Sequence, residues 1–302
     1  MWHALRALIV GGVALGLAVV AAGRERGPQP DPAAGRAAPT RVIVLGMVHQ
    51  SHRTSALYST ERVRSVIRQI MPDAVLAEIP PASLADAWSQ HRTEGKITRG
   101  RAAVFPEYTD ALFPIAQEAG FEIVATAAWT PEMNAERSEK LRRWRTERPQ
   151  EIKESDDAQA LATRRIAQLG DPNDPAVIHT DRYDQLVRAG MEPYNRLFNQ
   201  DIGAGGWDNI NRAHMALIHA ALDQRSGLGQ TVVITFGSWH KYWFLEDLKT
   251  RKDIELVDPL PYFQRVPPPP APTPPALTPP VPLPRPSTAP SLAPAGAYSS
   301  PA

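Results

Sequence analysis

Two apolar runs near opposite ends of this chain each lead to a glycine that is followed, three residues later, by a histidine. Residues 41–45 precede Gly46 and His49, and residues 231–236 precede Gly237 and His240. Both runs have the pattern of β-strands, and ligands bind at the carboxyl ends of strands in an open α/β sheet. Glycine permits a sharp turn or the close approach of a ligand, and histidine binds metals or transfers protons near neutral pH. The repetition therefore predicts an active site containing His49 and His240.

The first 22 residues have the features of an export signal. A basic start ending at Arg6 precedes an apolar run over residues 7–22, which ends in small residues. The run is shorter than the ~20 apolar residues of a typical membrane-spanning helix. We expect residues 1–22 to be a signal peptide or an uncleaved N-terminal anchor. The protein is then exported, periplasmic or secreted, and would contact a membrane only through this segment.

Proline-rich segments flank the part of the chain that can fold. Residues 23–40 are expected to form a linker. Residues 266–302 consist mainly of Pro, Ala, Ser and Thr with almost no charge. Such a tail cannot bury a core and is expected to be disordered and polyproline-II-like, serving as a spacer rather than binding a proline-recognising partner. Residues 41–265 remain as a single domain of ordinary size.

Composition restricts the chemistry. The 33 Lys and Arg residues nearly balance the 32 Asp and Glu residues, so no basic excess points to nucleic acid. The chain has no cysteine, which excludes disulfides, thiolate nucleophiles and thiolate–metal sites. Any metal ion must be held by His, Asp, Glu or water. The expected partner is a small-molecule or peptide substrate.

Strand and helix signals alternate along the domain. Strands are expected at residues 41–45, 74–79, 121–127, 231–236 and 254–257, and helices at residues 60–70, 82–91, 108–119, 207–224 and 240–249. The initial β-α-β-α-β order predicts an α/β fold with a mostly parallel central sheet flanked by helices. The charged residues 131–200 predict a helical insertion or lid, with breaks at residues 170–172 and at Gly190.

Three further residues are candidates for the site. Glu78 directly follows the second strand; if that strand neighbours the first, Glu78 lies beside His49 as a metal ligand or as a carboxylate that orients a base. Glu107 opens the helix over residues 108–119, where an acidic residue also suits the helix dipole. Arg212 could hold a carboxylate or an anionic intermediate. The structural alternatives are a helix-capping residue for Glu78, a loop histidine bonded to the backbone for His49, and a hydrogen-bonded core histidine for His240.

These motifs, in this order, resemble the Tiki/TraB/GumN-like superfamily, which has erythromycin-esterase-like relatives. The matching pieces are Gly46 to His49, Pro72 to Glu78, Glu107-Tyr108, the helix with Asn211, Arg212 and Met215, and Gly237 to His240 followed by Leu245 and Leu248. The resemblance covers residues 41–248. In this family Arg often precedes Asn on the late helix, whereas here Asn211 precedes Arg212.

The resemblance implies an α/β core in which both Gly-x-x-His motifs meet at one site. Some members of the family are metal-dependent proteases and some are esterase-like. The implied site residues are His49, Glu78 and His240, assisted by Arg212 and Glu107. We therefore expect an exported hydrolase that cleaves an ester or amide bond with activated water. The alternative is a non-catalytic envelope protein that binds a ligand or a metal ion.

Two versions of the hydrolase remain open from the sequence. In one, a divalent metal ion held by His49, Glu78 and His240 lowers the pKa of a bound water. In the other, His49 is a general base oriented by Glu78, and Arg212 or His240 stabilises an oxyanion.

A reporter fused after Ala38 tests the expected export. We expect the reporter to be found outside the cytoplasm, because the apolar run over residues 7–22 suits a signal or anchor. A matched fusion that lacks residues 2–22 should stay in the cytoplasm. Cytoplasmic reporter in both fusions would contradict the prediction.

Overall fold

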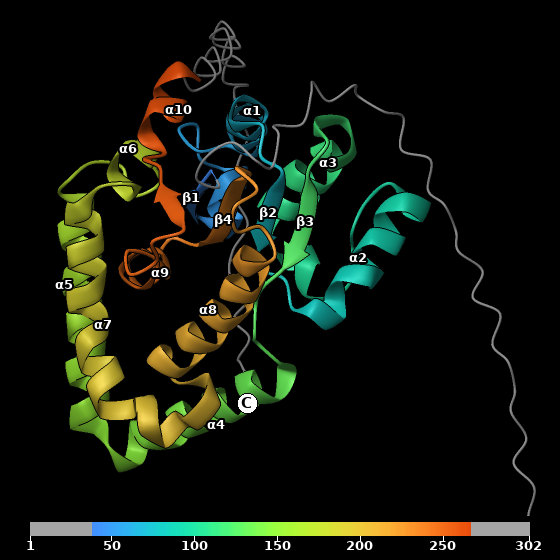
Figure 1. Ribbon diagram of the computed structural model, residues 1–302. Helices are drawn as coiled ribbons and strands as arrows, with labels where there is room; N and C mark the ends of the chain where they lie inside the picture. Colours follow the sequence, from blue (N-terminus) through green and yellow to red (C-terminus); the bar gives the residue numbers. More distant parts are fainter. Residues whose placement is uncertain (1–37, 267–302) are drawn as a thin grey trace, which may run out of the picture. The chain divides into compact units, whose positions relative to one another are not determined.

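The computed structural model describes residues 38–266, so the predicted signal or anchor, nearly all of the linker, and the proline-rich tail beyond Val266 lie outside the described residues. Five parallel strands form one sheet in the order β3-β2-β4-β1-β5 (Figure 1). Their bounds are β1 Thr40–Met47, β2 Ala74–Ala77, β3 Glu122–Ala125, β4 Thr231–Gly237 and β5 Ile254–Leu256. This architecture confirms the α/β fold with a parallel sheet.

Helices follow the strands in the expected sequence. They are α1 Thr60–Ile70, α2 Pro81–Glu94, α3 Phe113–Ala119, α4 Pro131–Glu147, α5 Pro149–Ala167, α6 Pro175–Ile178, α7 Asp181–Ile202, α8 Trp207–Asp223, α9 Lys241–Leu248 and α10 Leu260–Arg265. The Ser59 hydroxyl caps α1 by accepting a hydrogen bond from the backbone N–H of Arg62. Gly120 ends α3 in the left-handed conformation, as expected of a glycine C-cap. Within residues 38–266, no helix is both long and apolar enough to cross a membrane.

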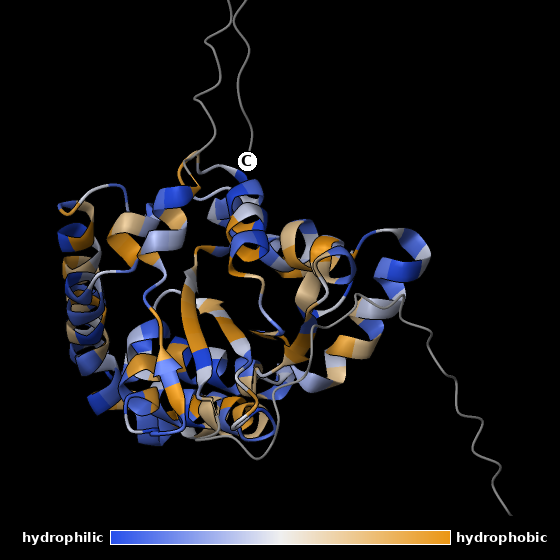
Figure 2. Ribbon diagram, turned by 45° about the horizontal axis from the view of Figure 1, so that its top comes forward, coloured by the Kyte–Doolittle hydropathy of each residue, from blue (hydrophilic) through white to orange (hydrophobic). Residues whose placement is uncertain are grey.

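Alternate residues of each strand enter two different cores, one on each face of the sheet. Ile43 and Leu45 pack with α1, with α3 and with the turn before α3. Val42 and Val44 pack with α8 and α9 on the other face. Side chains of a strand point alternately to opposite faces, and both faces of this sheet are covered, so its three central strands β1, β2 and β4 are mostly apolar. Figure 2 shows this as apolar strands between helices of mixed hydropathy.

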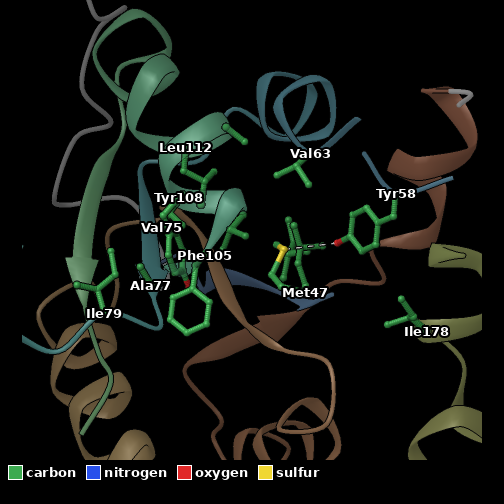
Figure 3. Close-up of a cluster of buried hydrophobic side chains, with 14 of the residues drawn as sticks. Met47, Tyr58, Val63, Val75, Ala77, Ile79, Phe105, Tyr108, Leu112 and Ile178 are labelled. Carbon is green, nitrogen blue, oxygen red and sulfur yellow. Dashed lines mark hydrogen bonds between the residues drawn. The ribbon is translucent and has the colours of Figure 1, made fainter. Parts of the chain in front are cut away.

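The core on the α1 face extends to the loops that carry the site. Figure 3 shows Met47, at the end of β1, close to Val63 of α1 and to Tyr58, whose hydroxyl contacts the Met47 sulfur at 3.8 Å. Phe105 and Tyr108 pack beside Val75 and Ala77 of β2 in the same view. The carboxyl ends of β1 and β2 are therefore anchored by apolar packing.

The central strand of the sheet comes late in the sequence. β4 pairs with β1 on one side and with β2 on the other, with Met47 opposite Gly237 and Ala77 opposite Thr235. The condition under which Glu78 was expected beside His49, direct pairing of the first two strands, is therefore not met. Any contact between these side chains must pass over the end of β4.

The helical insertion is present, but one of its expected breaks is absent. The chain turns between α5 and α6 around residues 168–174, as predicted, and also at Arg148 between α4 and α5. Helix α7 runs without interruption through Gly190. A Cβ atom at Gly190 would lie 2.7 Å from the Cβ of Ala162 on α5. Gly190 therefore permits close packing of α5 and α7, which lie side by side in Figure 1.

Substitution of Gly190 tests this packing. Ala normally stabilises a helix relative to Gly by about 0.5–1 kcal/mol. Here the added methyl group overlaps Ala162, and we expect Gly190→Ala to lower the free energy of unfolding by about 1–3 kcal/mol. Urea denaturation of Gly190→Ala, Ala162→Gly and the double variant measures the coupling between the two positions. A Gly190→Ala protein as stable as the parent, or more stable, would contradict the prediction.

Candidate active site

His49 lies in the short turn that follows β1, and its backbone is in a conformation that non-glycine residues rarely adopt. Its φ angle is 48°, and such left-handed positions are costly for non-glycine residues and are enriched at functional sites. The neighbouring His52 supports the turn. Its Nε2 accepts a hydrogen bond from the backbone N–H of Val48 at 3.1 Å, and its Nδ1 bonds the carbonyl of Tyr58 at 2.6 Å. His52 is therefore a structural residue that holds His49 in place.

Glu107 holds the imidazole of His49 from one side. It lies at the start of a single π-helical turn, Glu107–Leu112, that leads into α3. This carboxylate is completely buried, and its Oε1 accepts a hydrogen bond from His49 Nδ1 at 2.7 Å. Its other oxygen, Oε2, has no hydrogen-bond partner among the described residues. The contact fixes the neutral His49 tautomer as Nδ1–H and leaves Nε2 free to accept a proton.

Glu78 faces the other nitrogen of His49. Its Oε2 lies 3.7 Å from His49 Nε2 and accepts a hydrogen bond from the backbone N–H of Gly237 at 2.8 Å. The backbone N–H of Glu78 donates to the hydroxyl of Tyr108 at 2.6 Å, and that hydroxyl donates to the carbonyl of Thr235. Glu78 is thus fixed at the end of β2 by the strand that separates it from His49.

Gly237 makes the contact between His49 and Glu78 sterically possible. A Cβ atom at this position would lie 2.6 Å from His49 Nε2 and 3.6 Å from Glu78 Oε2. The two side chains therefore meet over the end of β4 where no side chain intervenes. The glycine of the first motif has a different function. Gly46 lies within β1, where a Cβ would come within 3.0 Å of Ser238 in the loop after β4.

The two carboxylates determine the protonation of the cluster. Burial lowers the pKa of His49, but the hydrogen bond to Glu107 and the charges of Glu107 and Glu78 outweigh burial, so that the pKa is raised above its usual value. Burial also raises the pKa of Glu78, despite the opposing effects of His49, the Gly237 N–H and Arg101. The imidazole and Glu78 therefore form a coupled acid–base pair in which both pKa values lie above their usual values.

His240 lies at the same edge of the sheet, at the N-cap of α9. Its Nδ1 is 2.6 Å from Asn211 Oδ1, while the amide nitrogen of Asn211 donates to the carbonyl of Trp207. The Asn211 oxygen must therefore accept, and His240 carries its proton on Nδ1. Burial, and then the neighbouring His214, His49 and Arg137, lower the pKa of His240 well below its usual value. His240 is neutral, with Nε2 as a hydrogen-bond acceptor.

The structure does not bring Arg212 to the site. The buried face of α8 includes Ile210, Asn211, His214, Met215 and Ile218. Arg212 follows Asn211 and is exposed. Its guanidinium donates a hydrogen bond to the side chain of Asn209. Asn211, its neighbour in sequence, is the residue of this helix that binds His240.

Two cavities with a common wall adjoin these side chains. The smaller, about 450 Å³, is lined by His49, Gly237 and Ser238, among others. The larger, about 950 Å³, is lined by Glu78 and Arg101, among others. His240, Trp207, Arg137 and Tyr194 line both cavities. Acid–base groups and His240 therefore border a space large enough for a small-molecule ligand.

The sequence patterns do not identify the two cations, Arg101 and Arg137, that line the larger cavity. Arg101 Nη2 lies 3.9 Å from Glu78 Oε1, and its guanidinium lies over the ring of Phe105. Arg137 of α4 lines both cavities. Both arginines occur in segments with several other charged residues, and no motif distinguishes them. Only the tertiary structure identifies them: Arg137 belongs to the helical insertion, and Arg101 belongs to the segment between α2 and Glu107.

The predicted metal ligands are His49, Glu78 and His240. Among the residues that the structure describes, no three His, Asp or Glu side chains are grouped so that they could hold a metal ion. His49 uses Nδ1 to contact Glu107, and His240 uses Nδ1 to contact Asn211. Such contacts leave Nε2 of each histidine free and are common in metal-binding histidines, so a metal ion at His49, Glu78 and His240 stays a prediction.

Comparison with family models, with curated proteins and with solved structures finds no significant match to this chain. The resemblance to the Tiki/TraB/GumN-like superfamily therefore depends on the sequence motifs.

Replacement of Glu107 tests the electrostatics of the site. Glu107→Gln removes the charge that most strongly favours protonated His49, and we expect the pKa of His49 to fall. The measurement is an NMR titration of the His49 imidazole, assigned by the signal lost in His49→Asn. The control is Glu118→Gln, which changes an exposed carboxylate paired with Arg68 and should leave the titration unaltered. An unchanged His49 pKa in Glu107→Gln would contradict the assignment.

Proposed function

We propose that this protein is an exported hydrolase that cleaves an ester or amide bond with a water molecule activated by His49. The observation that carries the proposal is the position of this imidazole. Its Nδ1 donates a hydrogen bond to buried Glu107 at 2.7 Å, and its Nε2 faces the carboxylate of Glu78 at 3.7 Å. A histidine held by one buried acid and facing another is the arrangement of an oriented general base.

In the first step, His49 Nε2 takes a proton from water as the water oxygen attacks the carbonyl carbon. The charge of Glu107 stabilises the imidazolium that forms, and the hydrogen bond to Nδ1 keeps the ring in place. The Nε2–Oε2 separation of 3.7 Å is too long for a direct hydrogen bond. A water molecule that contacts both atoms would be oriented by Glu78.

In the second step, the tetrahedral intermediate collapses, the bond to the leaving group breaks, and imidazolium His49 returns its proton to the leaving oxygen or nitrogen. Arg101, near Glu78 on the wall of the larger cavity, is the cation placed to stabilise the oxyanion. Neutral His240, with an unprotonated Nε2, cannot donate to an oxyanion. It would instead accept a hydrogen bond from a substrate N–H or O–H group.

The alternative function is non-catalytic binding of a ligand. The observation that favours it is the large cavity with Trp129 and Trp207 in its walls, because such a space binds a ligand whether or not a reaction follows. The metal-dependent version stays a prediction. Metal analysis of the purified protein, with and without His49→Ala, tests it.

The proposal agrees with the resemblance to the Tiki/TraB/GumN-like superfamily. Both Gly-x-x-His motifs lie at the carboxyl edge of one sheet, and Glu78 reaches the first histidine. This placement supports membership of that superfamily and an esterase-like or peptidase-like activity. It does not identify the substrate.

Hydrolysis of a panel of 4-nitrophenyl esters and fluorogenic peptides tests the function. We expect His49→Ala and Glu78→Gln to lower kcat/KM by about 10²- to 10⁴-fold, the usual contribution of acid–base catalysis. The rate should rise with pH through the pKa of His49, which must be unprotonated to act as base, and Glu107→Gln should shift this rise to lower pH. His219→Ala is the control, because His219 pairs with Asp247 and lines neither cavity. Unaltered activity in His49→Ala would refute the proposal.

A further inference from the structure

The larger cavity is lined by part of the helical insertion, by α8 and by the segments that follow β2 and β3. Its walls include residues from the loop after β3, from α4, α7 and α8, and from the end of β2. Figure 1 shows α4 and α8 near one another beyond the strands. Among the lining residues Glu78 is the sole acid, whereas Arg101 and Arg137 contribute two cations. The cavity therefore has an excess of positive charge.

Arg137 is held in a fixed position by aromatic residues. Its Nε donates a hydrogen bond to the hydroxyl of Tyr194 at 2.9 Å. Its guanidinium lies 5.7 Å from the centre of the Tyr194 ring and 5.8 Å from that of Trp129. These contacts orient the guanidinium without neutralising its charge.

The two terminal nitrogens of Arg137 have no hydrogen-bond or ion-pair partner within residues 38–266. Three other cations of α4 differ in this respect. Lys140, Arg142 and Arg143 each pair with a glutamate on the same helix. Nη1 and Nη2 of Arg137 are thus a free pair of parallel donors, which matches the two oxygens of a carboxylate.

Apolar and aromatic surface adjoins this cation. Trp129, Trp207 and Ile210 line the same cavity as Arg137. Trp207 also stacks on the imidazole of His240, with ring centres 4.6 Å apart. A ligand with an apolar body and one anionic group would fill this space and lie next to the catalytic residues.

We propose that Arg137 binds a carboxylate on the substrate, so that the protein acts on carboxylate-bearing amphipathic esters or amides whose apolar part lies between Trp129 and Trp207. The substrate class depends on the hydrolase function proposed above. The binding site for the carboxylate does not, because it stands on the free guanidinium and the cavity.

Isothermal titration of the full-length chain with three non-hydrolysable probes tests the site: 3-phenylpropionate, the neutral 3-phenylpropanol and 2-phenylethylphosphonate. We expect 3-phenylpropionate to bind about 10- to 100-fold more tightly than the alcohol, as for a charge-assisted hydrogen-bonded pair. Arg137→Gln should abolish this preference, and Arg137→Lys should restore part of it. The control is Arg142→Gln, on the same helix but paired with Glu139, which should bind all probes like the parent.

Four outcomes decide whether Arg137 binds a carboxylate of the substrate. Circular dichroism verifies that each variant folds. Loss of the preference in Arg137→Gln, with partial recovery in Arg137→Lys, supports the proposal. Equal affinity for acid and alcohol, or an acid preference that persists in Arg137→Gln, overturns it. A phosphonate bound about tenfold more tightly than the carboxylate assigns the site to phosphate esters and also overturns it.

The His49→Ala variant separates this proposal from the hydrolase function. We expect it to keep the preference for 3-phenylpropionate while it loses hydrolysis. Retained hydrolysis in that variant would refute the catalytic role and leave the carboxylate site standing. Hydrolysis that depends on His49, without any preference for the acid, would refute only the carboxylate site.

Discussion

The contact between His49 and Glu78 over Gly237 is the feature on which the rest of the site depends. The two side chains come from strands that β4 separates, and a single methyl group at Gly237 would overlap the His49 ring. The same glycine supplies the N–H that binds Glu78. The central strand therefore both separates these two side chains and connects them.

Burial of three ionisable groups in this cluster is costly and must be offset by their mutual contacts. Glu107 and Glu78 are nearly inaccessible to solvent, and an isolated buried carboxylate is strongly unfavourable. The His49 imidazole lies between the two carboxylates. When it is protonated, its positive charge offsets part of the cost of burying their negative charges. This compensation is the reason that the pKa of His49 is raised although burial alone would lower it. The left-handed backbone of His49 adds about 1–3 kcal/mol of strain, which the packing around His52 and Tyr58 must balance.

Several expectations from the sequence were met, and others failed for identifiable reasons. Apolar runs and capping signals located the strands and most of the helices, because these depend on local residue patterns. The helix break that the local pattern predicts at Gly190 is wrong, because Ala162 is distant in sequence and the close packing of α5 with α7 does not appear in a local pattern. Arg212 was selected for its charge, whereas the register of α8 turns Asn211 inward instead.

The sequence by itself determined the α/β class, the residues that follow β1, β2 and β4, and the absence of cysteine chemistry, because strand periodicity and composition are local properties. The tertiary structure decided which of those residues meet. Strand order places β4 between β1 and β2, a choice made by long-range packing and recorded in no motif. Three further features depend on contacts between segments at least 29 residues apart. They are the hydrogen bond between Glu107 and His49, the tautomer that Asn211 imposes on His240, and the position of Arg137 beside the larger cavity.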